Sequence, residues 1–436
     1  MPGNVRMLAM AHAKEGRLAW ARLFEPAIRL ARDGFAITPR LSLMLEEGKR
    51  TGALTAEGRA LFYQADGTAK PAGTIVRNPA LAVFLDQLAR RGPEYFYSGQ
   101  NAAAITSAVN RAPENPAPMT VADIAAYRAK ERPAVCGTYR TMRVCGMGPP
   151  SSGGITVLQV LKQLERFDLA AMGANDPRAW HLIAESMRLA YADRGLYEAD
   201  GDFVDVPVAG LIDPGYLASR SQLIAIDRTL PHAEPGVPAG APKVALGLTP
   251  DIKSTSHFVA ADRWGEVASL TSTIESSFGS GLVVNGYYLN NELTDFSLTP
   301  TGADGRLVAN RIEGGKRPRS SMAPSIVYAP DGSIRLAVGA AGGTTIPAQV
   351  LKAIIAVVDW KLTAQQAIAL PVLFAPGDVL FVEKGSSAEA MVPALQALGH
   401  VVQIRPPGFK ANAIEWRDDR WIGGTDPRSE GAAVAQ

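Results

Sequence analysis

The stretch from Lys253 to Ser280 constrains the fold of this chain more than any other. It holds two runs of alternating β-branched and small residues, His257 to Ala261 and Val267 to Ile274, with Arg263-Trp264-Gly265 between them. Two such runs around a glycine-containing turn predict a β-hairpin. Thr255 precedes the first run. Taken alone, a threonine in this place indicates only a good strand former.

The segment before that hairpin, Thr229 to Pro250, is rich in proline and glycine. This composition predicts an irregular, exposed segment that can be severed without unfolding the core. After the hairpin, residue patterns predict three helices, at Gln349 to Val358, Thr363 to Leu370 and Ala388 to Leu398, and two strands, at Val379 to Glu383 and Val401 to Arg405. Periodicity alone therefore predicts a mixed α and β protein.

Composition argues against several classes of protein. The 436 residues carry a net charge of +2, with 47% hydrophobic and 20% charged residues. This is a globular composition, and it gives no indication of a nucleic acid or an anionic membrane as partner. No apolar run reaches the length of a membrane span, and Met1 to Arg6 has no apolar centre of the signal-peptide type.

Two groups of residues raise the question of redox or metal chemistry. Cys136 and Cys145 lie on either side of a predicted turn, so they could face each other on a hairpin, but we expect two buried free thiols. His181 and Glu185 lie one helical turn apart on the predicted helix Ala179 to Tyr191. Because no third ligand is evident, we expect a solvated or hydrogen-bonded pair and no metal site.

The hairpin gains meaning from the motifs around it. In chain order these motifs are LARDGF (Leu30 to Phe35), PPSSGGI (Pro149 to Ile155), YADR (Tyr191 to Arg194), Thr255-Ser256-His257, LNNELTDFS (Leu289 to Ser297), GKRPRSSMAPS (Gly315 to Ser325), GAAGGTTI (Gly339 to Ile346) and GGTDPRS (Gly423 to Ser429). Each is a weak signal alone, but the ordered set is specific. With this set the chain resembles the γ-glutamyltransferases, N-terminal-nucleophile hydrolases whose precursors cut themselves before a threonine. The resemblance extends from Pro2 to about Arg428.

The resemblance implies an α/β fold, a four-layer αββα sandwich, with Thr255 as the nucleophile. It implies self-cleavage between Ser254 and Thr255 into a large-subunit portion, residues 1–254, and a small catalytic subunit, residues 255–436, which remain together as a heterodimer. The family's upstream part supplies core strands, a secretion signal in many members and a carboxylate-binding arginine. We expect that part to be missing before Met1. A periplasmic or extracellular location is what the resemblance implies.

A threonine at a new N-terminus can work without a catalytic histidine. A hydroxyl is a poor nucleophile without a base, and the α-amine of the threonine, with a reference pKa of about 7.7–8.0, suits that role. The tetrahedral intermediate also needs N–H donors. Gly342-Gly343 match the family's oxyanion loop, and Thr273 matches a threonine near the nucleophile. Without the resemblance these residues indicate only a glycine turn and an ordinary strand residue.

Substrate recognition calls for groups that bind a free α-amino acid, because a γ-glutamyl group ends in one. The ammonium needs carboxylates, and the carboxylate needs hydrogen-bond donors. Glu292 and Asp295 match the family's ammonium-binding positions, and Ser320 and Ser321 match its carboxylate-binding pair. On their own these residues indicate a surface loop and a turn.

Glu275 departs from the family pattern, since many relatives have asparagine there, in contact with the substrate's α-amino acid. We still assign it to substrate binding, where a carboxylate should favour an ammonium and disfavour a carboxylate. Arg319 stands where many relatives have leucine. We expect it to pair with Glu275, or to replace part of the function of the upstream arginine.

The leading hypothesis is a γ-glutamyl hydrolase/transferase that cleaves glutathione or related γ-glutamyl amides through an ester on Thr255. Its partners would be the small-molecule donor and water or an amino acid or peptide acceptor, with no cofactor. An alternative on the same scaffold is an amidase that resembles the cephalosporin and glutaryl acylases. A third hypothesis is an incomplete, inactive chain, or one that binds a partner supplying the missing part.

Overall fold

The computed structural model describes residues 2–250, 254–408 and 410–435, so Lys253, the first residue of the hairpin stretch, lies outside it. The chain forms two compact units. The first contains Met1–Glu131 and Thr273–Glu292, and the second contains Arg132–Ser272 and Leu293–Gln436. Both units hold residues from each side of the expected cut after Ser254. The division into residues 1–254 and 255–436 concerns that cut and stays a prediction.

The first unit is mainly helical. Its helices begin at polar caps, since Thr38, Thr55, Asn78 and Thr120 each accept a hydrogen bond from the first turn of the helix that follows. An aromatic and aliphatic core forms between the helices of residues 79–126 and residues 282–289. The elements are α1 Asn4–Glu15, η1 Trp20–Phe24, α2 Glu25–Asp33, β1 Phe35–Ala36, α3 Pro39–Glu47, α4 Lys49–Gly52, α5 Ala56–Phe62, β2 Ile75–Val76, α6 Pro79–Arg91, α7 Glu94–Tyr97, α8 Gly99–Asn110, α9 Val121–Ala126, β7 Val283–Val284 and β8 Tyr287–Tyr288.

The second unit is built on a six-stranded sheet in the order β15-β14-β10-β9-β4-β3, whose paired strands are antiparallel. Its strands and those of the smaller sheets are β3 Val135–Tyr139, β4 Met142–Gly146, β5 Ser256–Ala261, β6 Val267–Ser272, β9 Ser325–Tyr328, β10 Ile334–Ala341, β11 Leu373–Phe374, β12 Val379–Glu383, β13 Val401–Arg405, β14 Lys410–Arg417 and β15 Arg420–Thr425. Its helices are α10 Gly153–Leu164, α11 Leu169–Met172, α12 Pro177–Tyr197, α13 Val208–Leu211, α14 Pro214–Ser221, η3 Gly343–Thr345, α15 Ile346–Val358, α16 Ala364–Ala369, η4 Ser387–Met391 and α17 Val392–Ala397.

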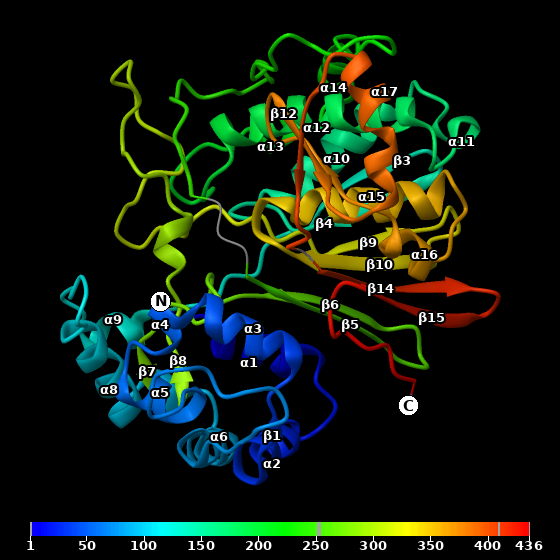
Figure 1. Cartoon of the computed structure of the whole chain (residues 1–436). Helices are drawn as coiled ribbons and strands as arrows, with labels where there is room; N and C mark the ends of the chain where they lie inside the picture. The colour runs from blue at the N-terminus through cyan, green and yellow to red at the C-terminus, as the bar shows by residue number, and fades with distance from the viewer. Residues whose placement is uncertain (1, 251–253, 409, 436) are drawn as a thin grey trace. The chain divides into compact units, whose positions relative to one another are not determined.

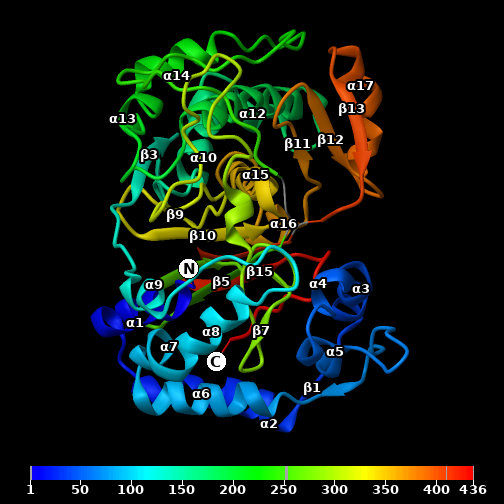
Figure 2. The same ribbon diagram turned by 90° about the vertical axis from the view of Figure 1, so that its left-hand side faces the viewer.

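The second unit has a layered arrangement. Helices α10 and α15 lie along one side of the six-stranded sheet and the β5–β6 hairpin lies along the other, as Figures 1 and 2 show from two directions. Helix α12 packs on α10, and its residues are almost all buried. The helices and the six-stranded sheet share one continuous apolar core. The expected mixed α/β class is confirmed.

Several sequence predictions match the observed elements closely. The hairpin forms as β5 and β6, which pair antiparallel from Ser256↔Ser272 to Ala261↔Val267. The strands β12 and β13 have the bounds predicted for them. Residues 229–250 contain neither a helix nor a strand beyond an isolated bridge at Ala245, as their proline and glycine content predicts.

The expectation of two buried free thiols was wrong. Cys136 and Cys145 are directly opposite in the β3–β4 register and form a disulfide. Cys136 is exposed and Cys145 is half-buried. Cross-strand pairing brings side chains on one face of a hairpin close enough to bond. The sequence predicted that the two cysteines could face each other, but not whether they would be free thiols or a disulfide.

Among the described residues, no helix combines the length and the apolar character needed to cross a lipid bilayer.

Candidate active site

The proposed nucleophile lies at the start of the central hairpin. Ser254 and Thr255 directly precede β5 and are half-buried. The Thr255 hydroxyl donates a hydrogen bond of 2.6 Å to the carbonyl oxygen of Ser254, the residue whose peptide bond it would attack. The reacting hydroxyl and carbonyl of the expected cut are therefore already in contact.

A close contact fixes strand β5 against β10. A Cβ atom added to Gly339 would lie 2.2 Å from the ring of His257, so only glycine leaves room for the imidazole there. The ring bonds Thr271 through Nδ1 at 2.8 Å, and burial lowers the His257 pKa to about 4. His257 is therefore a neutral packing residue, and it ties the strand after Thr255 to the strand that leads into Gly342.

The candidate oxyanion loop begins where β10 ends. Gly342 has φ +133° and Gly343 has φ +60°, values that disfavour residues with side chains. Their backbone leads through η3 into α15, so this loop lies at a helix N-terminus, where N–H groups and the helix dipole favour negative charge. The Thr345 hydroxyl holds the Gly342 carbonyl at 2.7 Å, and the Tyr191 hydroxyl holds the Thr344 carbonyl at 2.5 Å.

The first unit holds three of the predicted residues, Thr273, Glu275 and Glu292. The backbone N–H of Glu275 donates to the Thr273 hydroxyl at 2.8 Å. Glu275 is buried and has φ +76°, a left-handed conformation that costs a non-glycine residue about 1–2 kcal/mol. Carboxylate oxygens of Glu275 and Glu292 lie within 4.8 Å of each other. Two carboxylates this close create a strongly negative site that suits a cation such as an ammonium.

Asp295 lies one turn after Glu292, at the end of the 3₁₀ helix η2, Glu292–Asp295. The second unit thus contains Thr255, Asp295, the Ser320–Ser321 pair and the two glycines, while the first contains Thr273, Glu275 and Glu292. Their joint use as one site stays a prediction.

The serine pair is held from behind by residues that the sequence analysis left without a specific role. Arg194 donates from Nη2 to the Ser321 hydroxyl at 2.6 Å and from Nε to the Ser152 hydroxyl at 2.8 Å. Ser152 in turn donates its hydroxyl to the Ser320 carbonyl at 2.7 Å. These residues come from the YADR and PPSSGGI motifs, so the motifs themselves were the signal that could have found them.

Arg319 belongs to the second unit and Glu275, its expected partner, to the first, so their pairing stays a prediction. The Arg319 guanidinium is buried and donates to the Arg194 carbonyl at 2.9 Å and to the Thr249 hydroxyl at 3.1 Å. Burial lowers its pKa to about 9, so it remains charged at neutral pH. These contacts have a physical reason, because the end of α12 presents backbone carbonyls that can accept hydrogen bonds from a buried guanidinium.

Glu198, just after α12, completes this group. It is 1% exposed, and neither carboxylate oxygen has a hydrogen-bond partner among the described residues. Burial raises its pKa to about 8, while the charges of Arg194 and Arg319 oppose that rise. We call Arg194, Glu198, Arg319 and Ser321 the arginine cluster.

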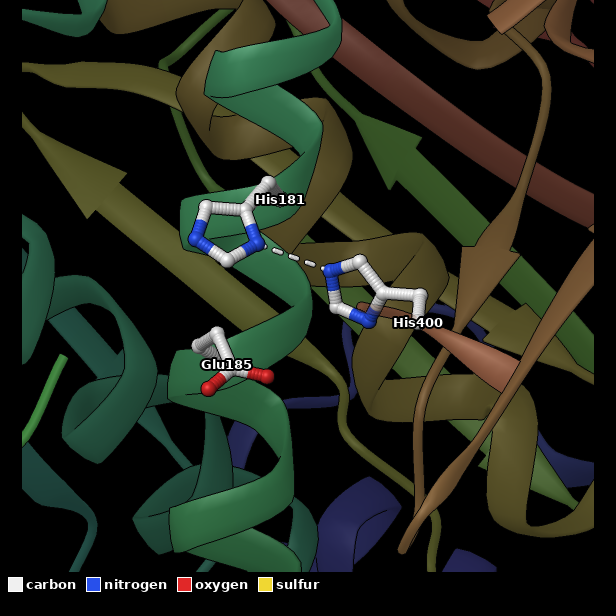
Figure 3. A group of neighbouring side chains, drawn as sticks. All are labelled: His181, Glu185 and His400. Carbon is white, nitrogen blue, oxygen red and sulfur yellow. Dashed lines mark hydrogen bonds between the residues drawn. The ribbon is translucent and has the colours of Figure 1, made fainter. Parts of the chain in front are cut away.

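A second buried polar group lies nearer the start of α12, and Figure 3 shows three of its members. His181 and His400 share a hydrogen bond of 2.8 Å between Nδ1 and Nε2, so the third neighbour that was not evident in the sequence is His400. The Ala225 carbonyl takes the other nitrogen of His181 at 2.8 Å. A carbonyl only accepts, so His181 carries its proton on Nε2 and accepts at Nδ1 from His400.

Glu185 is also saturated by the protein. Its oxygens accept from Arg188 at 2.7 Å and from the Leu230 backbone N–H at 2.7 Å. A metal ion would have to replace the proton between the two imidazoles, at a spacing suited to a hydrogen bond. We call His181, Glu185, Arg188 and His400 the histidine cluster. The expected solvated or hydrogen-bonded pair of His181 and Glu185 is not what forms, because both residues are buried and each bonds other groups.

Comparison with known proteins identifies the family of this chain. The gamma-glutamyltranspeptidase family matches residues 1–436. The glutathione hydrolase proenzyme of Escherichia coli (strain K12) is 34% identical over 446 residues, which cover 98% of this chain and 73% of that protein. The Acylase ACY 1 proenzyme of Pseudomonas sp. (strain SE83) is 32% identical over 440 residues, which cover 100% of this chain and 75% of that protein.

A solved structure shares the fold. The cephalosporin acylase from Bacillus halodurans superimposes with a TM-score of 0.86 at 24% identity, covering 100% of this chain and 78% of that one. This likeness confirms the fold expected from the sequence. With the match over the whole chain, it follows that this protein belongs to the gamma-glutamyltranspeptidase family.

Proposed function

We propose that this chain is a self-processing γ-glutamyl hydrolase/transferase with Thr255 as its nucleophile. The observation that carries the proposal is the 2.6 Å hydrogen bond from the Thr255 hydroxyl to the Ser254 carbonyl, at the head of β5 and directly after an irregular segment. Relatives that cover the chain are named as proenzymes, which supports a processing step.

In the precursor, Thr255 Oγ attacks the Ser254 carbonyl carbon. The C–N bond breaks, its nitrogen takes the hydroxyl proton, and Ser254 is left as an ester on Thr255. Water hydrolyses that ester, which releases a carboxylate on Ser254 and frees both the amine and the hydroxyl of Thr255. The amine then has the pKa range needed of a general base, about 7.7–8.0 in model compounds.

In the mature enzyme, the same hydroxyl attacks the γ-amide carbonyl of the donor while the α-amine takes its proton. The Gly342-Gly343 loop, at the N-terminus that leads into α15, stabilises the oxyanion. The amine of the donor's amide then leaves, after taking the proton from the α-amine of Thr255, and a γ-glutamyl ester remains on Thr255. Water or an amino-acid amine then resolves that ester, giving hydrolysis or transfer.

The donor's free α-amino acid explains the other assigned residues. Glu275, Glu292 and Asp295 bind the ammonium, and the hydroxyls of Ser320 and Ser321 bind the carboxylate. Thr273 supports this site by accepting the Glu275 backbone N–H. The preferred donors are therefore γ-glutamyl amides such as glutathione.

An acylase on the same scaffold is the second candidate. The observation that favours it is the similarity to the Acylase ACY 1 proenzyme. An acylase of this type would take glutaryl or related acyl groups, which have no ammonium for Glu275 and Glu292 to bind.

Two measurements test these proposals. Denaturing intact mass of freshly purified protein should show two species divided between Ser254 and Thr255, and Thr255→Ala should show a single uncut chain. Turnover of γ-glutamyl-p-nitroanilide should then exceed that of glutaryl-p-nitroanilide. A wild-type chain that stays uncut would refute self-processing, and a preference for the glutaryl substrate would favour the acylase.

A further inference from the structure

The serine pair of the second unit is arranged so that both hydroxyl protons are available. Arginine has no acceptor atom, so the Ser321 oxygen must accept the 2.6 Å hydrogen bond from Arg194. The Ser320 oxygen likewise accepts from the Met322 backbone N–H at 3.2 Å. Within the part of the chain that the structure describes, neither hydroxyl donates to a protein group. Each keeps its proton for a ligand.

The support behind the serines is buried and continuous. Arg194 is 7% exposed, and its second hydrogen bond goes to Ser152, whose hydroxyl and backbone N–H both hold the Ser320 carbonyl, at 2.7 and 2.8 Å. Arg319 holds the Arg194 carbonyl at 2.9 Å. One guanidinium therefore orients the Ser321 side chain directly and the Ser320 backbone through Ser152.

This arrangement is suited to a carboxylate. Two adjacent O–H donors match the two oxygens of such a group, and a buried cation behind them strengthens both bonds because the local dielectric is low. The half-buried serines remain accessible, while the guanidinium is committed to Ser321 and Ser152. The charge therefore acts on a ligand through the hydroxyls.

We propose that Arg194 is the positioning residue that makes Ser320 and Ser321 a receptor for the α-carboxylate of the donor. The inference rests on the proposed function and names the residue that gives its substrate site selectivity for a carboxylate. Arg194 does not touch the substrate; it sets the direction of the hydroxyl protons and supplies the positive potential behind them.

Three anilides that differ by one group each test this role. γ-Glutamyl-p-nitroanilide carries both the carboxylate and the ammonium, glutaryl-p-nitroanilide carries only the carboxylate, and 4-aminobutyryl-p-nitroanilide carries only the ammonium. Arg194→Met should raise KM for the first two by about tenfold to a hundredfold, the range for a lost charge-assisted hydrogen bond. For the third, KM should change less than about twofold, and kcat should change little for all three.

Two further variants separate positioning from folding. Ser152→Ala keeps Arg194 but removes its second partner, and should cause the same selective rise in KM at about a third of the size. Arg194→Lys keeps the charge with a single donor and should restore part of the selectivity. Arg178→Met, an exposed arginine on the same helix, is the control and should leave all three KM values unchanged. Equal losses on all three anilides would overturn the role of Arg194.

Binding separates this inference from the proposed function. By calorimetry, wild-type protein should bind L-glutamate more tightly than 4-aminobutyrate, which lacks the α-carboxylate, and Arg194→Met should remove that difference. If wild-type protein failed to turn over any anilide, the proposed function would fail, yet this binding difference would still support the receptor. Equal binding of the two ligands by wild-type protein would overturn it.

Discussion

Helix α12 and the residue that follows it bury two glutamates with opposite hydrogen bonding. Glu185 in the histidine cluster has both oxygens bonded, to Arg188 and to the Leu230 N–H. Glu198 in the arginine cluster is equally buried, but neither oxygen has a partner among the described residues. A carboxylate with full hydrogen bonding is a structural group, whereas one without it has a charge that its surroundings barely stabilise. The second kind lies beside the candidate substrate site.

The largest expected effect comes from breaking the fully bonded pair. Arg188→Met leaves Glu185 buried without its cation, and should lower the free energy of unfolding by about 3–5 kcal/mol, measured by urea denaturation. Carboxylate selectivity should stay as in wild type. Arg90→Met removes an exposed pair with Asp86 and should cost less than about 1 kcal/mol. Equal losses in the two variants would contradict a structural role for the Arg188 pair.

Removing Arg319 and Glu198 together should lower the free energy of unfolding less than removing Arg319 alone. At pH 8.5, above the Glu198 pKa of about 8 and below the Arg319 pKa of about 9, Arg319→Leu removes a cation that stabilises the Glu198 carboxylate and should cost about 3 kcal/mol. Adding Glu198→Leu should recover more than half of that loss, because the double variant no longer buries a carboxylate without its cation. A double-mutant cycle by urea denaturation measures this coupling. Additive losses would show that the two charges do not interact.

Acid should weaken the histidine cluster. Burial, with the charges of His181 and Arg188, lowers the His400 pKa to about 3 from an ordinary 6.5. Between these pH values the unfolded chain binds a proton that the folded chain does not, so stability is full above pH 6.5 and falls as the pH drops. The slope is at most about 1.4 kcal/mol per pH unit for this residue. His400→Asn should reduce the slope of unfolding free energy against pH below 6.5; an unchanged slope would refute this assignment.

Alkali should weaken the arginine cluster, and this is the smallest effect. The Glu198 pKa is raised to about 8, so the folded chain holds a proton that the unfolded chain has lost, and stability falls as the pH rises toward 8. The expected loss between pH 7 and 8 is about 1 kcal/mol. Glu198→Gln cannot titrate and should lack it. Thermal denaturation at the two pH values, with wild type and Glu185→Gln beside it, would reveal whether the effect belongs to Glu198.

Local patterns predicted local structure well in this chain. The alternation of residues around Arg263-Trp264-Gly265 predicted β5 and β6, and the runs at β12 and β13 were predicted with their bounds. These elements depend on neighbours close in sequence, or on a period that one face of a sheet imposes. The family motifs then identified the candidate nucleophile and its glycine loop, which periodicity could not do.

Contacts between distant residues were the part that the sequence did not reveal. Arg319 bonds the end of α12, 125 positions away in the sequence. His400 bonds His181 across 219 positions. Cys136 and Cys145 were placed opposite each other by the predicted hairpin, but their bond could not be inferred from spacing. In each case the bonding partner depends on which side chains are buried together and on which buried polar groups lack a hydrogen bond. Both are properties of the tertiary fold.

The bonds that α12 makes to later parts of the chain bear on the life of the protein after the proposed cut. Three side chains of α12 form hydrogen bonds with residues that follow Thr255 in the sequence: Tyr191 with Thr344, Arg194 with Ser321 and His181 with His400. While the chain is whole, the two partners find each other at the high effective concentration of one molecule. Once the peptide bond is gone, an unfolded pair must meet by diffusion, and refolding becomes dependent on dilution. Such an enzyme persists through slow unfolding rather than ready reassembly, and its maturation is a step in one direction.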